Sequence, residues 1–175
     1  MNESSRSKIN PDSSCVCVRE AAVTDADAIA RIYNTQVDAG GSTFDTQHWN
    51  RAAVCDLLDF GEPDGWFVAE ENGGVVGWAS VRRYSLRIGY RFTCETAIYL
   101  SPIAFGKGIA DELQQRVESH CCDHKMHHAV AKIIADNERS IAFHRRFGYE
   151  LVGIQKEIGY MNGSWSDVAI LQKIF

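Results

Sequence analysis

Apolar residues recur along the chain with two different periods, and this pattern predicts a domain that mixes helices and strands. Apolar positions two apart indicate strands, whereas positions three and four apart indicate helices. The first half of the chain predicts a strand at residues 16–19, a helix opened by a capping box at Thr24 and Asp27, and a second helix at about 47–59. A hairpin at residues 66–81 follows, because Asn72-Gly73-Gly74 is a strong turn signal between two apolar runs.

The second half of the chain continues the pattern and completes the element order. It predicts a strand at 94–100, a helix after Gly108, a strand at 129–135, a helix at 136–147 that Gly148 ends, and strands near 151–156 and 167–174. The predicted order is β-α-α-β-β-β-α-β-α-β-β, with no internal repeat or linker. The fold class is therefore α/β in a single domain.

Composition narrows the classes of protein that this chain can be. Its 175 residues are 45% hydrophobic and 23% charged, as in globular proteins with an ordinary core. The net charge of -5 argues against a nucleic-acid partner, and no apolar run approaches the length of a membrane span. The polar start of the chain lacks a secretory signal, so we expect a cytoplasmic protein with a flexible tail at 1–14 and a domain at 15–175.

Six cysteines and six histidines raise the question of a metal site. The cysteines contain no C-x-x-C pair, which favours free thiols in a cytosolic chain. Residues 120–128, HCCDHKMHH, hold ligand types that suit zinc, but the adjacent cysteines match no standard spacing. The alternative is the end of a helix and its loop, where histidines favour the helix dipole. We predict no metal site.

Residues 101–113, SPIAFGKGIADEL, place two glycines between a predicted strand and a predicted helix. The helix N-terminus at about Gly108 would offer amide N–H groups free of side-chain cover, an arrangement that binds a pyrophosphate. Glycines in this pattern also serve tight turns and close packing, and the loop lacks the ending of a P-loop. By itself the loop leaves both interpretations open.

The order of motifs around this loop resembles the GNAT acetyltransferase superfamily. After the strand, loop, helix and strand comes Asn137-x-x-Ser140-x-x-Phe143, followed by Phe147-Gly148-Tyr149. The resemblance implies a mixed, mostly antiparallel sheet flanked by about four helices, and acetyl-CoA as acetyl donor. Phe105 departs from the family pattern, which has Gln or Arg there. The implied cofactor-binding residues are Ile98, Tyr99, Leu100, Phe105, Gly106, Lys107, Gly108, Ile109, Ala110, Asn137 and Ser140.

Four segments carry a closer resemblance: IYN at 32–34, STFDT at 42–46, YRFTCE at 90–95 and GYMNGSWSDV at 159–168. Over about residues 16 to 174 they are similar in order and spacing to the phosphinothricin (methionine sulfoximine) N-acetyltransferase group. This resemblance implies a small amino-acid-like amine as acceptor, a homodimer, and no nucleic-acid or membrane partner. The catalytic residues that it implies are Glu95 as base and His144 as acid or proton relay. The substrate-binding residues that it implies are Phe44, Arg87 and Tyr90. Ser85 stands where herbicide-detoxifying members tend to carry a basic residue, which counts against phosphinothricin itself.

Each of these side chains also has a structural interpretation. Glu95 shares a strand face with Ala97 and Tyr99, where a carboxylate is unusual, but it could pair with a nearby Arg at a strand edge. His144 could be a surface residue of a basic helix, Arg87 a solvated loop charge and Asn137 an ordinary N-cap.

Two further functions remain open at this point. The acceptor could be another amine, such as a polyamine, a peptide N-terminus or an aminoglycoside. Phe105 also leaves open a catalytically silent binding module with the same fold. Our prediction is an acetyl-CoA-dependent N-acetyltransferase that acts on a small amino-acid analogue.

Overall fold

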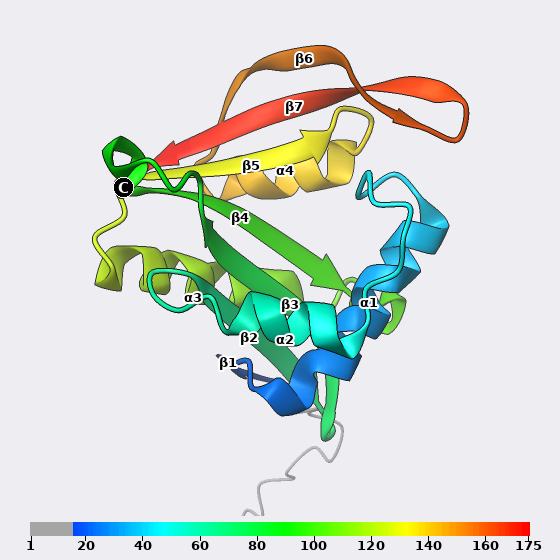
Figure 1. Cartoon of the computed structure of the whole chain (residues 1–175), viewed down its shortest axis with the longest axis vertical. Coiled ribbons are helices and arrows are strands. Elements are labelled where there is room, and N and C mark those ends of the chain that lie inside the picture. The colour runs from blue at the N-terminus through cyan, green and yellow to red at the C-terminus, as the bar shows by residue number, and fades with distance from the viewer. Residues whose placement is uncertain (1–15) are drawn as a thin grey trace, which may run out of the picture.

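The computed structural model describes residues 16–175, which form one seven-stranded sheet with helices on both faces (Figure 1). The tail predicted at 1–14, together with Cys15, lies outside the described residues. The strands are β1 (Val16–Glu20), β2 (Gly65–Glu71), β3 (Gly74–Arg83), β4 (Thr93–Leu100), β5 (His128–Ile134), β6 (Glu150–Met161) and β7 (Ser164–Ile174). The helices are α1 (Ala26–Ala39), α2 (Arg51–Leu58), α3 (Ile109–Asp123) and α4 (Glu138–Arg146).

The strands lie in the order β1-β2-β3-β4-β5-β7-β6. Every neighbouring pair is antiparallel except β4 and β5, which run parallel. This arrangement confirms the predicted element order and the mixed, mostly antiparallel sheet with four helices. No helix within residues 16–175 is long and apolar enough to cross a membrane.

Two hydrophobic clusters cover the two faces of the sheet. On one face, α3 packs through Ile109, Leu113 and Val117, which are at most 1% exposed, as their predicted stripe requires. Ile141 of α4 joins the same cluster. On the other face, α1 and α2 pack against Trp66, Val68 and Trp78 of β2 and β3. The helices therefore hold the sheet rigidly up to β4, where the candidate site begins.

Local signals explain most of the element boundaries. Asn72 and Gly73 both have positive φ (54° and 78°), as the tight turn between β2 and β3 requires. The same geometry recurs at Asn162 and Gly163 between β6 and β7. Gly148 ends α4 with φ of 82°.

Two helix starts differ from the prediction. The α1 helix begins at Ala26 rather than at Thr24, because the Asp25 carboxylate accepts the Ala22 N–H at 2.8 Å and pairs with Arg19. The α2 helix begins at Arg51 rather than near Gln47, because the side chain of Asn50 accepts the Ala53 N–H at 2.9 Å.

Candidate functional site

The parallel strands β4 and β5 separate soon after they meet, and this separation creates the site. Only three residue pairs join them: Thr93 with His128, Cys94 with Ala129, and Glu95 with Val130. Beyond these pairs β4 continues to Leu100 and β5 to Ile134. The facing backbone groups beyond Glu95 and Val130 therefore have no strand partner. The Leu100 carbonyl accepts the Gln36 side chain and the Ile134 carbonyl accepts the Asn137 N–H. The other facing N–H and C=O groups can pair with an extended ligand in the way that an added strand does.

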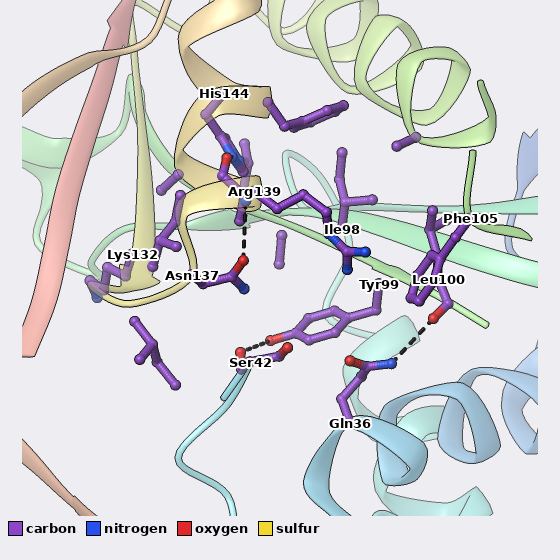
Figure 2. A pocket seen from close by; sticks show the side chains of 18 of the residues that line it. Gln36, Ser42, Ile98, Tyr99, Leu100, Phe105, Lys132, Asn137, Arg139 and His144 are labelled. Atoms are coloured by element: carbon purple, nitrogen blue, oxygen red, sulfur yellow. Dashed lines mark hydrogen bonds between the residues drawn. The ribbon is translucent and has the colours of Figure 1, made fainter. Parts of the chain in front are cut away.

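A pocket of about 240 Å³ occupies the gap between the two strands, and we call it the splay pocket (Figure 2). Its walls come from β4, β5, one side of α4, the loop before α3 and Gln36 of α1. Of the predicted cofactor-binding residues, it is lined by Ile98, Tyr99, Leu100, Phe105, Gly106, Ala110, Asn137 and Ser140. Lys107, Gly108 and Ile109 do not line it, and the Ile109 side chain is buried in the core. Only the backbone of Ile109 is therefore available to a ligand.

The loop before α3 has the geometry of an anion-binding helix start. Gly106 and Gly108 adopt positive φ (76° and 79°), and a Cβ added at either would meet no atom within 4 Å. Gly108 is the N-cap of α3, so the first amide N–H groups of this helix are not covered by a capping side chain. Lys107 pairs with the buried carboxylate of Glu71 at 2.8 Å instead of pointing into the splay pocket.

Arg139 adds a positive charge to this end of the splay pocket. Its guanidinium lies 4.4 Å from the centre of the Phe105 ring, and both side chains line the pocket (Figure 2). The ring therefore positions a cation from α4 beside the loop, where the family pattern would have Gln or Arg. At position 105 this chain thus has an aromatic ring that packs against an arginine of α4, instead of a polar side chain of its own.

His144 also lines the splay pocket, and its hydrogen bond determines which nitrogen carries the proton. Nδ1 lies 2.8 Å from the Ser140 carbonyl oxygen, which can only accept, so Nδ1 donates. Burial lowers the pKa of His144 below its usual value, against the opposing effect of the Ser140 hydrogen bond. At neutral pH the ring is therefore neutral, and Nε2 can accept a proton but has none to donate.

Tyr149 supports the His144 ring from the core side. The two rings meet edge to face with centroids 5.1 Å apart. The Tyr149 hydroxyl lies 3.2 Å from Thr96 Oγ1, and burial is the main cause that raises its pKa to about 12. Tyr149 thus connects His144 to β4 as a neutral side chain.

A second pocket, of about 600 Å³, opens on the α1 and α2 face of the sheet, and we call it the aromatic pocket. Its lining includes seven aromatic side chains: Tyr33, Phe44, Trp49, Trp66, Trp78, Tyr84 and Tyr99. The Tyr33 and Trp49 rings stack at 3.8 Å, and the Tyr33 hydroxyl donates to Asp45 at 2.7 Å. These contacts make the wall rigid. The residues shared with the splay pocket are Ser42, Thr96, Ala97, Tyr99, Lys132 and Ile134.

Glu95 lies on the floor of the aromatic pocket, at the point where β4 and β5 begin to separate. Its carboxylate pairs with Lys132 Nζ of β5 at 2.6 Å, and the two side chains are 39% and 46% exposed. Arg82 of β3 stands opposite Glu95 in the strand register and also lines the pocket. The lining thus holds one carboxylate between two cations.

The three predicted acceptor residues lie in different places. Phe44 lines the aromatic pocket, and its ring packs over Gly159, where an added Cβ would fall 2.3 Å from the ring. Arg87 and Tyr90 are exposed, and neither lines the splay pocket or the aromatic pocket. Tyr90 contacts Tyr84 with ring centroids 5.4 Å apart. Their part in acceptor binding stays a prediction.

The histidines and cysteines of residues 120–128 are dispersed among structural contacts. His120 Nε2 lies 2.9 Å from the Pro63 carbonyl oxygen, and the Cys121 thiol lies 3.7 Å from that of Cys94 in the core. Across residues 16–175 there is no group of three or more His, Cys, Asp or Glu side chains placed to hold a metal ion.

Lys132 and Arg139 are the site residues that the sequence did not reveal. Lys132 is a charged residue inside a short apolar strand, AVAKII, and that interruption was the available signal. Arg139 lies in a helix rich in basic residues, so nothing in the sequence distinguished it from Arg145 or Arg146.

Comparisons with known proteins agree with this geometry. Residues 18–170 match the acetyltransferase (GNAT) domain family. The phosphinothricin N-acetyltransferase of Alcaligenes faecalis is 31% identical over 167 residues, which cover 91% of this chain and 83% of that protein. The L-amino acid N-acyltransferase MnaT of Escherichia coli is 30% identical over 166 residues, covering 89% and 91%.

A solved structure shows the same fold with a ligand. The phosphinothricin acetyltransferase of Sinorhizobium meliloti in complex with AcCoA superposes with a TM-score of 0.87 at 32% identity. The match covers 91% of this chain and 88% of that one.

Proposed function

Because the chain belongs to the GNAT acetyltransferase family, we propose that it transfers the acetyl group of acetyl-CoA to the amino group of a small amino acid or amino-acid analogue. The observation that carries this proposal is the meeting of the two pockets beside Glu95. A donor in the splay pocket and an acceptor in the aromatic pocket would share six lining residues, so their reacting groups would come together there.

The residues of the splay pocket fit acetyl-CoA. The uncovered amides at the start of α3 and the Arg139 guanidinium suit phosphate oxygens. The unpaired edges of β4 and β5 suit the amide-bearing pantetheine arm. When bound, acetyl-CoA supplies a thioester whose carbonyl carbon a neutral amine can attack.

We assign proton transfer to Glu95 and His144. An amino acid arrives mostly as the ammonium form, and the Glu95 carboxylate accepts its proton so that the nitrogen becomes nucleophilic. His144 is neutral at the start, so it acts as a relay. After the amine attacks the thioester carbon, Nε2 takes up the proton that the new C–N nitrogen must lose, and it donates this proton to the thiolate as the C–S bond breaks. Tyr149 keeps the ring in place through the edge-to-face contact.

The aromatic pocket supports an acceptor larger than glycine with a flat or apolar side chain. Its volume of about 600 Å³ and its stacked rings favour such a group, which Tyr33, Trp49 and Phe44 would contact. The two cations on its floor disfavour a polyamine, because like charges repel at short range.

We also propose a homodimer. Exposed apolar side chains gather on the β6–β7 hairpin, at Ile154, Ile158, Tyr160 and Trp165, each at least 46% exposed. Such a patch is typical of an interface between protein chains. Light scattering at several concentrations tests this part, and a monomer throughout would refute it.

The proposed activity is tested by measuring thiol release from acetyl-CoA with a panel of acceptors. The panel holds the common L-amino acids, methionine sulfoximine, phosphinothricin, a polyamine and an aminoglycoside. Amine-dependent release with at least one amino acid or analogue is expected, and mass spectrometry should find that product heavier by one acetyl group. Release with none of the panel would refute the activity, and release with the polyamine alone would refute the acceptor class.

A further inference from the structure

We propose that Lys132 is a specificity-determining residue that binds the carboxylate of the acceptor and thereby frees Glu95 to act as the base. This inference rests on the proposed function, and it names Lys132 as the side chain that selects acceptors with a carboxylate. It begins from the position of Lys132, the only charged residue from 16 to 175 that lines both pockets.

The strand register explains why a lysine reaches this point. Lys132 lies two residues beyond Val130, the last position at which β5 pairs with β4. Residues two apart on a strand share a face, and Val130 pairs with Glu95, so Lys132 and Glu95 project on the same side of the sheet at the mouth of the separation. The Lys132 ammonium then contacts Glu95 at 2.6 Å.

This ion pair is suited to exchange. Both side chains are well exposed, and an exposed pair contributes little to stability because water screens it. A second carboxylate that arrives in the pocket can therefore take Lys132 as its partner. Arg82 is the other cation of the lining, and its side chain makes no hydrogen bond or ion pair with the residues that the structure describes, so the floor carries an excess of one positive charge.

An α-amino acid matches this arrangement of charges. Its ammonium and carboxylate groups are attached to one carbon, so they can meet Glu95 and Lys132 at the same time. The acceptor carboxylate would replace Glu95 on Lys132, and Glu95 would turn to the acceptor ammonium. A purely cationic amine brings no carboxylate, so Glu95 stays paired and Lys132 repels the ligand.

The test compares an acid with its amide in four proteins. The proteins are the wild type, Lys132→Met, Lys132→Arg and, as a matched control, Lys125→Met, which changes an exposed lysine after α3 that lines neither pocket. The acceptors are the amino acid that the wild type acetylates fastest and its α-carboxamide. The amide has a more acidic ammonium group, so each variant is compared with the wild type on the same acceptor.

We expect Lys132→Met to raise KM for the acid about 10- to 100-fold, the range of a lost hydrogen bond to a charged group. KM for the carboxamide should change little, Lys132→Arg should retain most of the affinity for the acid, and Lys125→Met should behave as the wild type. Circular dichroism and a cooperative urea transition should be retained by all four, which shows that each is folded.

Three results would overturn the inference. The first is that Lys132→Met leaves KM for the acid and for the carboxamide unchanged. The second is that it raises KM for both acceptors equally. The third is that Lys132→Arg raises KM for the acid as much as Lys132→Met does, although it is folded. A wild type that acetylates no amino acid or analogue would instead refute the proposed function itself. The two failures are therefore distinguishable.

Discussion

Replacement of Arg139 by Ala should weaken acetyl-CoA binding, because this guanidinium is the cation that Phe105 positions in the splay pocket. A charge-assisted hydrogen bond contributes about 1.5–3 kcal/mol. Arg139 is exposed, so the low end applies, and about 1.4 kcal/mol corresponds to a tenfold change in Kd. We therefore expect Kd to rise about tenfold in Arg139→Ala.

Phe105 should act through Arg139. Replacing its ring by Ala removes a cation–π contact worth about 0.5–1 kcal/mol at an exposed site, or roughly two- to fivefold in Kd. If the ring acts only by positioning the guanidinium, the double variant should bind no more weakly than Arg139→Ala alone.

Isothermal titration with acetyl-CoA measures these effects, and Arg145→Ala is the matched control. Arg145 lies in the same helix, and within residues 16–175 its side chain makes no hydrogen bond, ion pair or cation–π contact. A second titration uses S-acetylpantetheine, which lacks the phosphates. Arg139→Ala should bind this fragment as the wild type does. Equal losses for Arg139→Ala and Arg145→Ala, or an equal loss with the fragment, would refute the assignment of Arg139 to the phosphates.

Three other predictions concern catalysis and stability. Glu95→Gln should reduce turnover about 10²- to 10⁴-fold near neutral pH and less at high pH, where the amine loses its proton unaided; an equal loss across a pH–rate profile would mean that Glu95 has a structural role. Because burial lowers the pKa of His144, the unfolded chain binds more protons than the folded one below about pH 6.5. The free energy of unfolding, measured with urea, should therefore fall as the pH drops through this range, and His144→Gln should make it depend less on pH. An unchanged pH dependence in His144→Gln would contradict the lowered pKa of His144. A Cβ at Gly77 would lie 2.4 Å from Leu100 Cδ2 and 3.3 Å from both Leu113 Cδ1 and the Tyr99 carbonyl oxygen. Gly77→Ala should therefore lower the free energy of unfolding by about 1–3 kcal/mol, and an unchanged urea midpoint would contradict this crowding.

Most of the fold could be predicted from the sequence, because its strongest signals are local. The α3 stripe, the Asn72–Gly73 turn and the glycine after α4 each act within a few residues. The length of β6 could not be predicted in the same way. The prediction placed this strand near 151–156, but β6 extends to Met161. Most of its side chains are exposed, so no alternation of apolar and polar residues marks its course.

The sequence predicted only those parts of the site that come from one continuous segment each. The β4 run, the glycine loop and the start of α4 are each continuous in sequence, and parts of all three line the splay pocket. The pairs that add charge to the site are 37 and 34 residues apart, Glu95 with Lys132 and Phe105 with Arg139. Such contacts depend on how β5 and α4 are placed against β4 and its loop, which no local pattern encodes.

The three-residue register between β4 and β5 also has a mechanical consequence. The strands on either side of it are joined by longer registers: seven residue pairs join β3 to β4, and seven join β5 to β7. The sheet should therefore bend most easily along the line between β4 and β5. A rotation about this line would change the widths of both pockets together, since they share lining residues on both strands. The two binding steps then depend on a single degree of freedom, and the first ligand to bind sets the shape that the second one meets.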